Sequence, residues 1–176
     1  MGNLTNLQTN LIIDAVKTFA VAMFRTFAKN FLLVMPDADL ERTIAACMTS
    51  FYGNTGQRCL SGANLVIVGE GLSEHEYNAF YEKVTDAFID AASKIRVGYG
   101  LNETVQMGPL RDKSKKERVT KFIEKGIEEG AKLSLDGRNV KIVGDWPHNC
   151  FLNPTAFEDV TPDMTIGREE IFGSSL

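Results

Sequence analysis

The chain has 176 residues, of which 44% are hydrophobic and 24% charged, with a net charge of −4. This composition is that of a folded globular chain of about one domain, and it excludes disordered, collagen-like and low-complexity proteins. Lysines and arginines are scattered apart from the cluster Arg111–Lys116, so the charge pattern argues against a nucleic-acid partner.

Membrane insertion and secretion are also not indicated. The apolar stretches around Phe19–Phe24 and Phe31–Met35 are much shorter than the roughly 20 residues that span a bilayer. The first ten residues lack the basic region and cleavage site of a secretion signal. The three cysteines show no CxxC spacing, which favours a reducing, cytoplasm-like compartment with neither disulfides nor a metal cluster.

In the first half of the chain, apolar runs alternate with amphipathic segments. Leu11–Ala28 is apolar almost all round, as in one buried helix or two shorter segments, and Phe31–Met35 resembles a strand covered on both faces. Pro36 ends that strand, and Asp37 or Asp39 can cap the next helix. That helix has an apolar face made of Leu40, Ile44, Cys47, Met48 and Phe51.

A glycine-containing segment separates this helix from the next elements. Gly53–Gly56 ends the helix and opens a loop to Cys59, and Asn64–Val68 is expected to form a second buried strand. Ser73 and Glu76 have the spacing of a capping box, which predicts a helix reaching about Ile95.

The second half begins with a long loop. Three glycines and a proline fall within Val97–Leu110, and a helix then runs from Asp112 to about Glu129, with Gly130 as its stop. Short strands are expected at Lys132–Leu135 and Asn139–Val143, where the intervening Asp136–Gly137 pair indicates a hairpin, and Phe151–Phe157 is expected to be extended. Together these elements predict an α/β fold, a mostly parallel sheet flanked by helices, with a peripheral hairpin.

Cys59 is the first candidate for chemistry. It follows Arg58 in a glycine-rich loop, and a nearby cation together with backbone N–H groups can lower a thiol pKa and produce a nucleophile. The alternative is that Cys59 is a small, inert core residue. His75 and His148 are far apart in sequence and in polar surroundings, and neither forms part of a recognisable catalytic set.

Six ordered segments resemble the aldehyde dehydrogenase superfamily, and within it the chain is most similar to the CoA-acylating methylmalonate-semialdehyde dehydrogenases. The resemblance covers about residues 28–176, and its segments are AKNFLLVMPDADL, GNTGQRC, MGPL, KERVTKFIEKGIEEGAKLSLDGR, FLNPTAFEDVTPDM and EEIFG. It implies that Cys59 attacks the aldehyde, that hydride passes to NAD, and that coenzyme A takes the acyl group from the resulting thioester. It also implies that Arg58 holds the carboxylate of the semialdehyde substrate.

The same resemblance implies the cofactor contacts and one departure. Lys29 corresponds to a lysine at the adenosine ribose of NAD, Glu170 to the glutamate at the nicotinamide ribose, and Phe172 to an aromatic residue near the nicotinamide. Hydrolytic relatives carry a general-base glutamate where this chain has Arg25, which agrees with acyl transfer to CoA rather than to water. Bulky Phe27 departs from the small residues that the acylating branch has there.

The resemblance also predicts how the chain is organised. Residues 1–27 are expected to be a divergent remnant of the end of a cofactor domain, and residues 28–176 a partial catalytic domain. We therefore expect the chain alone to bind NAD weakly and to lack turnover, with a homo-oligomer formed by the full-length enzyme. The cytoplasm is the expected location, or the mitochondrial matrix for a eukaryotic form. The alternative is a non-catalytic dehydrogenase-like module that folds or self-associates without turnover.

Overall fold

The computed structural model describes residues 29–146 and 149–174. Three expectations lie outside these residues: the apolar helix or helices over Leu11–Ala28, the divergent segment 1–27 and the placement of Arg25.

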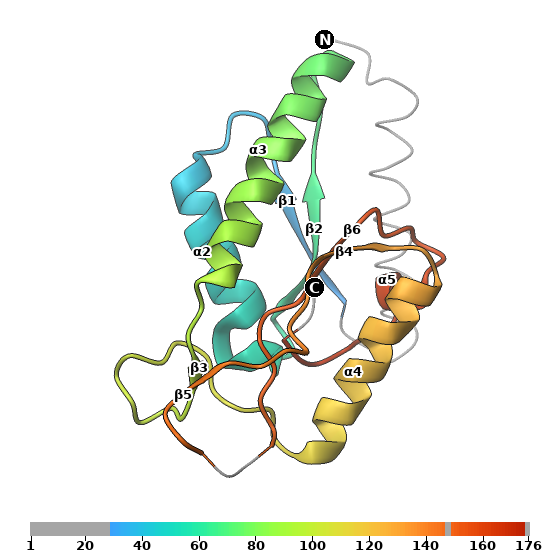
Figure 1. Cartoon of the computed structure of the whole chain (residues 1–176). Helices are drawn as coiled ribbons and strands as arrows, with labels where there is room; N and C mark the ends of the chain where they lie inside the picture. The colour runs from blue at the N-terminus through green and yellow to red at the C-terminus, as the bar shows by residue number, and fades with distance from the viewer. Residues whose placement is uncertain (1–28, 147–148, 175–176) are drawn as a thin grey trace.

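The first unit is built from two strands and two helices. Strand β1 (Asn30–Val34) pairs in parallel with β2 (Gly62–Ile67), with Leu33 opposite Val66. Helices α2 (Leu40–Tyr52) and α3 (Glu74–Ser93) lie side by side against this pair (Figure 1). Each strand is followed by a helix, so β1, α2 and β2 form the crossover unit that parallel pairing requires.

Local capping signals determine where both helices begin. Asp39, rather than Asp37, caps α2 by accepting a hydrogen bond from the Arg42 backbone N–H at 2.9 Å. The capping box before α3 is confirmed, because the Ser73 side chain accepts from the Glu76 N–H while the Glu76 carboxylate accepts from the Ser73 N–H.

The expectation that the first strand is covered on both faces is wrong for this structure. Val34 and Ile67 pack with Val84 of α3, but Leu33 is 58% exposed and Met35 39% exposed. Among the described residues, α2 and α3 contribute their apolar faces to one side of the β1–β2 pair, and Leu33 on the opposite side is exposed.

The second unit surrounds helix α4 (Lys113–Glu128), which is capped by Asp112 and followed by Gly130 with a left-handed φ of 92°. The other elements are short. They are β3 (Val97–Gly98), β4 (Lys132–Leu135), β5 (Ile142–Val143), β6 (Ala156–Glu158) and α5 (Thr165–Arg168). The expected long loop Val97–Leu110 therefore begins with a short strand.

The predicted hairpin does not form. Strand β4 pairs antiparallel with β6, and β5 pairs in parallel with β3. The reason lies in the Asp136–Gly137 turn. The Gly137 N–H donates to the Thr155 hydroxyl at 3.1 Å, and the Gly137 carbonyl accepts from the Asn153 N–H at 3.0 Å. The turn is thus bound to a distant segment, which directs the following chain away from β4.

The α/β class is confirmed. Within the described residues, two of the three strand pairs are parallel, and helices flank them (Figure 1). The two larger apolar clusters of the core lie around Phe51 and Phe88 and around Ile123 and Leu152. None of the described helices has the length and apolar character needed to cross a membrane.

Candidate active site

The loop that carries Cys59 begins with a sharp turn at the end of α2. Asn54 and Thr55 have left-handed φ values of 53° and 59°, a conformation that is unfavourable for a β-branched residue such as threonine. The buried Thr55 hydroxyl donates to the Gly108 carbonyl at 3.0 Å, which helps to hold this turn. The loop then brings the Cys59 side chain to the surface, where it is exposed. The alternative of a core cysteine does not apply at this position.

Asn30 fixes the backbone at the cysteine and just after it. Its side-chain amide donates to the carbonyl oxygens of Cys59 and Ser61, each at 2.8 Å. Because Asn30 is the first residue of β1, the loop is anchored to the sheet. Our sequence analysis assigned Asn30 no role, although its place beside Lys29 in the AKN segment was a usable signal.

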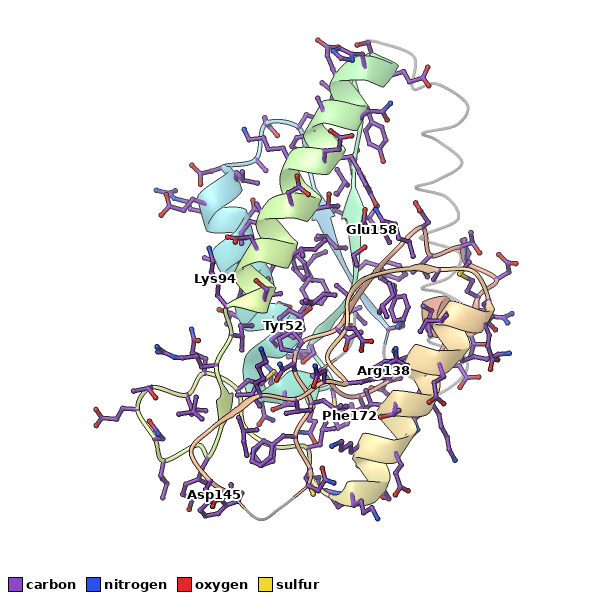
Figure 2. All side chains as sticks on the ribbon, in the orientation of Figure 1. Tyr52, Lys94, Arg138, Asp145, Glu158 and Phe172 are labelled. Atoms are coloured by element: carbon purple, nitrogen blue, oxygen red, sulfur yellow. The ribbon has the colours of Figure 1, made fainter. Side chains whose placement is uncertain are left out.

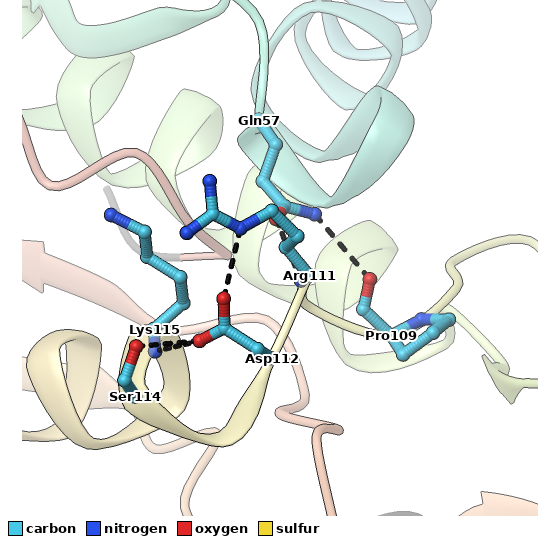
Figure 3. A network of polar contacts seen from close by, with 6 residues as sticks. All are labelled: Gln57, Pro109, Arg111, Asp112, Ser114 and Lys115. Atoms are coloured by element: carbon cyan, nitrogen blue, oxygen red, sulfur yellow. Dashed lines mark hydrogen bonds and ion pairs between the residues drawn. The ribbon is translucent and has the colours of Figure 1, made fainter.

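Gln57 ties the same loop to the MGPL segment (Figure 3). Its amide nitrogen donates to the Pro109 carbonyl at 3.4 Å, and its amide oxygen accepts from the Arg111 backbone N–H at 2.9 Å. Asp112 continues the network, because it accepts from Ser114, Arg111 and the Lys115 N–H, and these bonds lower its carboxyl pKa well below the usual range. Two segments quoted for the resemblance are therefore joined directly.

Arg58 points back toward helix α2. One guanidinium nitrogen donates to the Thr49 carbonyl and, at 3.3 Å, to the Ser50 carbonyl. Arg58 therefore supplies a hydrogen-bond donor and a positive charge to carbonyl groups in the last turn of the helix, which lack intrahelical donors. Arg58 also lines a small cleft beside the loop. A guanidinium has five N–H donors, so these bonds leave donors with which it can bind a carboxylate.

The cleft brings together four of the residues that the resemblance assigns to the site. Besides Arg58 it is lined by Lys29, Glu170 and Phe172, and by Ser61, whose buried hydroxyl has no hydrogen-bond partner among the described residues. Phe172, which is labelled in Figure 2, has a φ of 58° that places it in the left-handed region. Cys59 does not line this cleft and lies next to Arg58 in the adjoining loop.

Lys29 is buried, which is unusual for a lysine. Only 2% of the residue is exposed, and desolvation lowers its pKa from 10.5 to about 8, partly opposed by the negative charge of Glu170. The resemblance placed Lys29 and Glu170 at opposite ends of NAD, whereas here the two charges share one cleft.

The Cys59 loop and the EEIFG segment are in direct contact through two glycines. Gly56 has a φ of 68°, and a Cβ atom built on it would lie 2.2 Å from the Gly173 carbonyl oxygen. A Cβ atom on Gly173 would in turn lie 2.4 Å from a Val119 methyl group of α4. The two segments therefore pack so closely that neither glycine has room for a side chain.

The three thiols are expected to differ strongly in reactivity. Cys59 is exposed and Cys150 half-buried, while Cys47 is buried and desolvation raises its pKa to about 11. Because the thiolate is the reactive form, iodoacetamide near neutral pH should modify Cys59 first and Cys47 last. Peptide mapping by mass spectrometry at increasing times measures this order. Modification of Cys150 before Cys59 would contradict the expectation.

Burial of Lys29 predicts a stability that rises with pH. The unfolded chain keeps an ordinary lysine pKa of 10.5, so above pH 8 it binds more protons than the folded chain does, and alkali favours folding. The free energy of unfolding should gain about 2 kcal/mol between about pH 7.5 and 9.5 from this group. Urea titrations at several pH values measure the gain.

The control for this prediction is Lys29→Met, which should lack the gain. Measurements stop near pH 9.5 because burial raises the pKa values of Tyr52 and Tyr81 in the folded chain. Ionisation of these phenols in the unfolded chain therefore lowers stability above about pH 10. Equal slopes for wild type and Lys29→Met would contradict the prediction.

Comparisons with known proteins extend these observations. Over 149 residues, the chain is 42% identical to malonate-semialdehyde dehydrogenase 1 of Geobacillus kaustophilus, a match that covers 85% of this chain and 28% of the relative. It is 37% identical over 149 residues to the mitochondrial acylating methylmalonate-semialdehyde dehydrogenase of Arabidopsis thaliana, a match covering 85% of this chain and 23% of that relative. The chain thus spans less than a third of the length of these relatives.

Solved structures give the same result. The methylmalonate-semialdehyde dehydrogenase of Oceanimonas doudoroffii superposes with a TM-score of 0.76 at 28% identity, covering 92% of this chain and 33% of that one. The NAD⁺ complex of an aldehyde dehydrogenase from Bacillus cereus superposes with a TM-score of 0.72 at 34% identity, covering 85% of this chain and 28% of that one. The family model "Aldehyde dehydrogenase family" matches residues 10–175, beginning upstream of the motifs found by inspection. The chain belongs to the aldehyde dehydrogenase family.

Proposed function

We propose that this chain is the catalytic segment of an NAD-dependent, CoA-acylating dehydrogenase that converts malonate or methylmalonate semialdehyde into acetyl-CoA or propionyl-CoA through a thioester on Cys59. The observation that carries the proposal is an exposed thiol on an anchored loop, beside a cleft containing Arg58, Lys29, Glu170 and Phe172. The names of the relatives support the substrate class, since they are malonate- and methylmalonate-semialdehyde dehydrogenases.

The residues of the cleft fit the nicotinamide half of NAD. The Glu170 carboxylate can accept hydrogen bonds from ribose hydroxyls, and the buried hydroxyl of Ser61 offers a further polar contact. Phe172 supplies an apolar wall beside them, and the Lys29 charge balances Glu170. NAD, when bound, supplies the hydride acceptor of the reaction.

The protein's own residues carry the remaining steps. The Cys59 thiolate adds to the aldehyde carbon, and the backbone N–H of Cys59 stabilises the negative charge that develops on the oxygen. Loss of hydride from that carbon to NAD leaves a malonyl or methylmalonyl thioester on Cys59. Release of its carboxylate as CO2 and protonation of the adjacent carbon then give the acetyl or propionyl thioester. The Arg58 guanidinium, beside Cys59 in sequence, binds the substrate carboxylate through charge-assisted hydrogen bonds.

Coenzyme A is the proposed acyl acceptor. Its thiolate attacks the thioester carbon and displaces the Cys59 thiolate, so one thioester replaces another. The name of the Arabidopsis relative includes the word acylating, which supports this half of the proposal. The thiol chemistry also fits a compartment that keeps cysteines reduced, such as the cytoplasm or the mitochondrial matrix.

The acyl-transfer half can be tested on this chain alone. Incubation with propionyl-CoA should run the last step in reverse, which places a propionyl group on Cys59 and releases free CoA. Intact-mass and peptide mass spectrometry locate the acyl group, and a thiol reagent quantifies CoA. Cys59→Ser should abolish the reaction, and Cys150→Ser should leave it unchanged. A folded chain with a free Cys59 thiol and no acylation would instead support the non-catalytic module.

A further inference from the structure

Arg118 of α4 binds the backbone of the EEIFG segment through hydrogen bonds. One guanidinium nitrogen donates to the Ile171 carbonyl at 2.7 Å, and the other donates to the Glu170 carbonyl at 3.0 Å. The guanidinium carbon also lies 4.7 Å from the centre of the Phe122 ring on the same helix. The planar group is thus held on an aromatic face while both terminal nitrogens bind consecutive carbonyl oxygens, a geometry that lysine cannot reproduce.

The EEIFG segment that Arg118 binds lies outside regular secondary structure. Helix α5 ends at Arg168, Glu169 is extended, and Phe172 adopts its left-handed φ immediately after the two carbonyls that accept from Arg118. Val119, the residue after Arg118, packs against Gly173 at the end of the segment. Two consecutive residues of a regular helix therefore fix the path of a segment whose side chains face the cleft.

We propose that Arg118 is the positioning residue that holds the Glu170 carboxylate, and with it Phe172, in the cleft beside Lys29. This inference rests on the proposed function only in one respect, namely that Glu170 contacts the nicotinamide ribose. Arg118 acts through the backbone carbonyls and does not itself line the cleft. Through the Gly173–Gly56 contact, the same hydrogen bonds support the loop that carries Cys59.

The pKa of Lys29 can be used to follow the position of the Glu170 carboxylate when no substrate or cofactor is present. Glu170 raises the pKa of the buried Lys29 by its negative charge, so a Glu170 that leaves the cleft should lower that pKa. The measurement is an NMR titration of the Lys29 side-chain ¹³Cε signal in the isotope-labelled chain. Arg118→Met should lower the Lys29 pKa in the same direction as Glu170→Gln, and Arg118→Lys should lie between Arg118→Met and wild type.

A control and a second measurement separate positioning from general unfolding. Lys121→Met removes an equal charge from an exposed position of the same helix and should leave the Lys29 pKa unchanged. Amide hydrogen exchange at residues 170–173 should accelerate at least tenfold in Arg118→Met, while core amides such as that of Ile123 keep their protection. If Arg118→Met unfolds globally, Arg118→Lys must give the intermediate pKa and exchange rates for the proposal to stand.

The proposal is overturned if Glu170→Gln shifts the Lys29 pKa and Arg118→Met leaves both the pKa and the exchange rates as in wild type. It is also overturned if Glu170→Gln itself has no effect, because the carboxylate is then not beside Lys29. No aldehyde, NAD or CoA is present in these measurements. A failure of the proposed function appears separately, as a Cys59 that propionyl-CoA does not acylate.

Discussion

Adding CoA to a chain that carries a propionyl group on Cys59 should remove this group about 10²–10⁴-fold faster than water alone does. General-base help is typically worth a factor of this size, and the resemblance puts Arg25, which cannot accept a proton, where hydrolytic relatives have their glutamate. Water is a poor nucleophile without such help, whereas a thiol reacts through its thiolate. The acyl-enzyme should therefore persist until CoA arrives.

The experiment loads Cys59 from a phenyl thioester, removes the excess reagent, and follows the acyl group by intact-mass spectrometry. Cysteamine, which has a thiol but no nucleotide, is the matched control, and the difference between its rate and that of CoA measures recognition of the rest of CoA. Hydroxylamine should release the group in all samples, which verifies the thioester bond. If water removes the group as quickly as CoA does, a carboxylate is serving as the base and the acylating assignment is wrong.

Gly56→Ala should destabilise the chain by about 2–5 kcal/mol, through two effects that add. The φ of 68° is strained for alanine, and the new Cβ atom would lie 2.2 Å from the Gly173 carbonyl oxygen, a backbone atom that cannot rotate away. Left-handed strain costs on the order of 1–2 kcal/mol, and overpacking typically adds 1–3 kcal/mol. Urea denaturation measures the loss.

Gly71→Ala is the matched control for this prediction. Gly71 has a similar φ of 79°, but a Cβ atom there would have no neighbour within 4 Å. Its substitution isolates the conformational cost, about 1 kcal/mol, so the difference between the two variants reports the contact between the Cys59 loop and the EEIFG segment. Equal losses for both variants would show that the two segments can separate at little cost.

Short-range signals were sufficient for much of the fold. The capping box at Ser73 and Glu76 and the glycine stop at Gly130 each act within a few residues, and each is found where the sequence placed it. The alternation of these helices with apolar strands was enough to predict the α/β class. Strand partners were harder, because the Gly137 hydrogen bonds to Asn153 and Thr155 join residues that no local pattern relates.

In the candidate site, too, residues within a motif could be predicted and contacts between distant segments could not. The resemblance selected Cys59 from its loop and Glu170 and Phe172 from EEIFG, and the structure places the last two in one cleft with Lys29. Asn30 and Arg118 escaped prediction because they act on backbone carbonyls of distant segments, and such contacts require no particular sequence pattern at the acceptor. The burial of Lys29 was equally invisible, since an isolated lysine in a sequence is most often exposed.

Thr155 connects three segments that are far apart in the chain. The buried Tyr52 hydroxyl donates to its carbonyl at 3.2 Å across 103 positions of sequence, its own hydroxyl accepts from Gly137, and its N–H donates to the Ser174 carbonyl at 2.9 Å. During translation, Tyr52 is synthesised long before any of these partners. Strands β1 and β2 and helices α2 and α3 can associate once residue 93 has left the ribosome.

From this arrangement we expect an order of assembly. Contacts between distant residues form slowly because a large loop must first close, so the hydrogen bond from Tyr52 to Thr155 should form after the first unit has folded. Meanwhile the edge-to-face pair of Phe51 and Phe88 can already hold α2 against α3. The later bond from Tyr52 to Thr155 is then expected to join the two units, whose residues together line the candidate cleft.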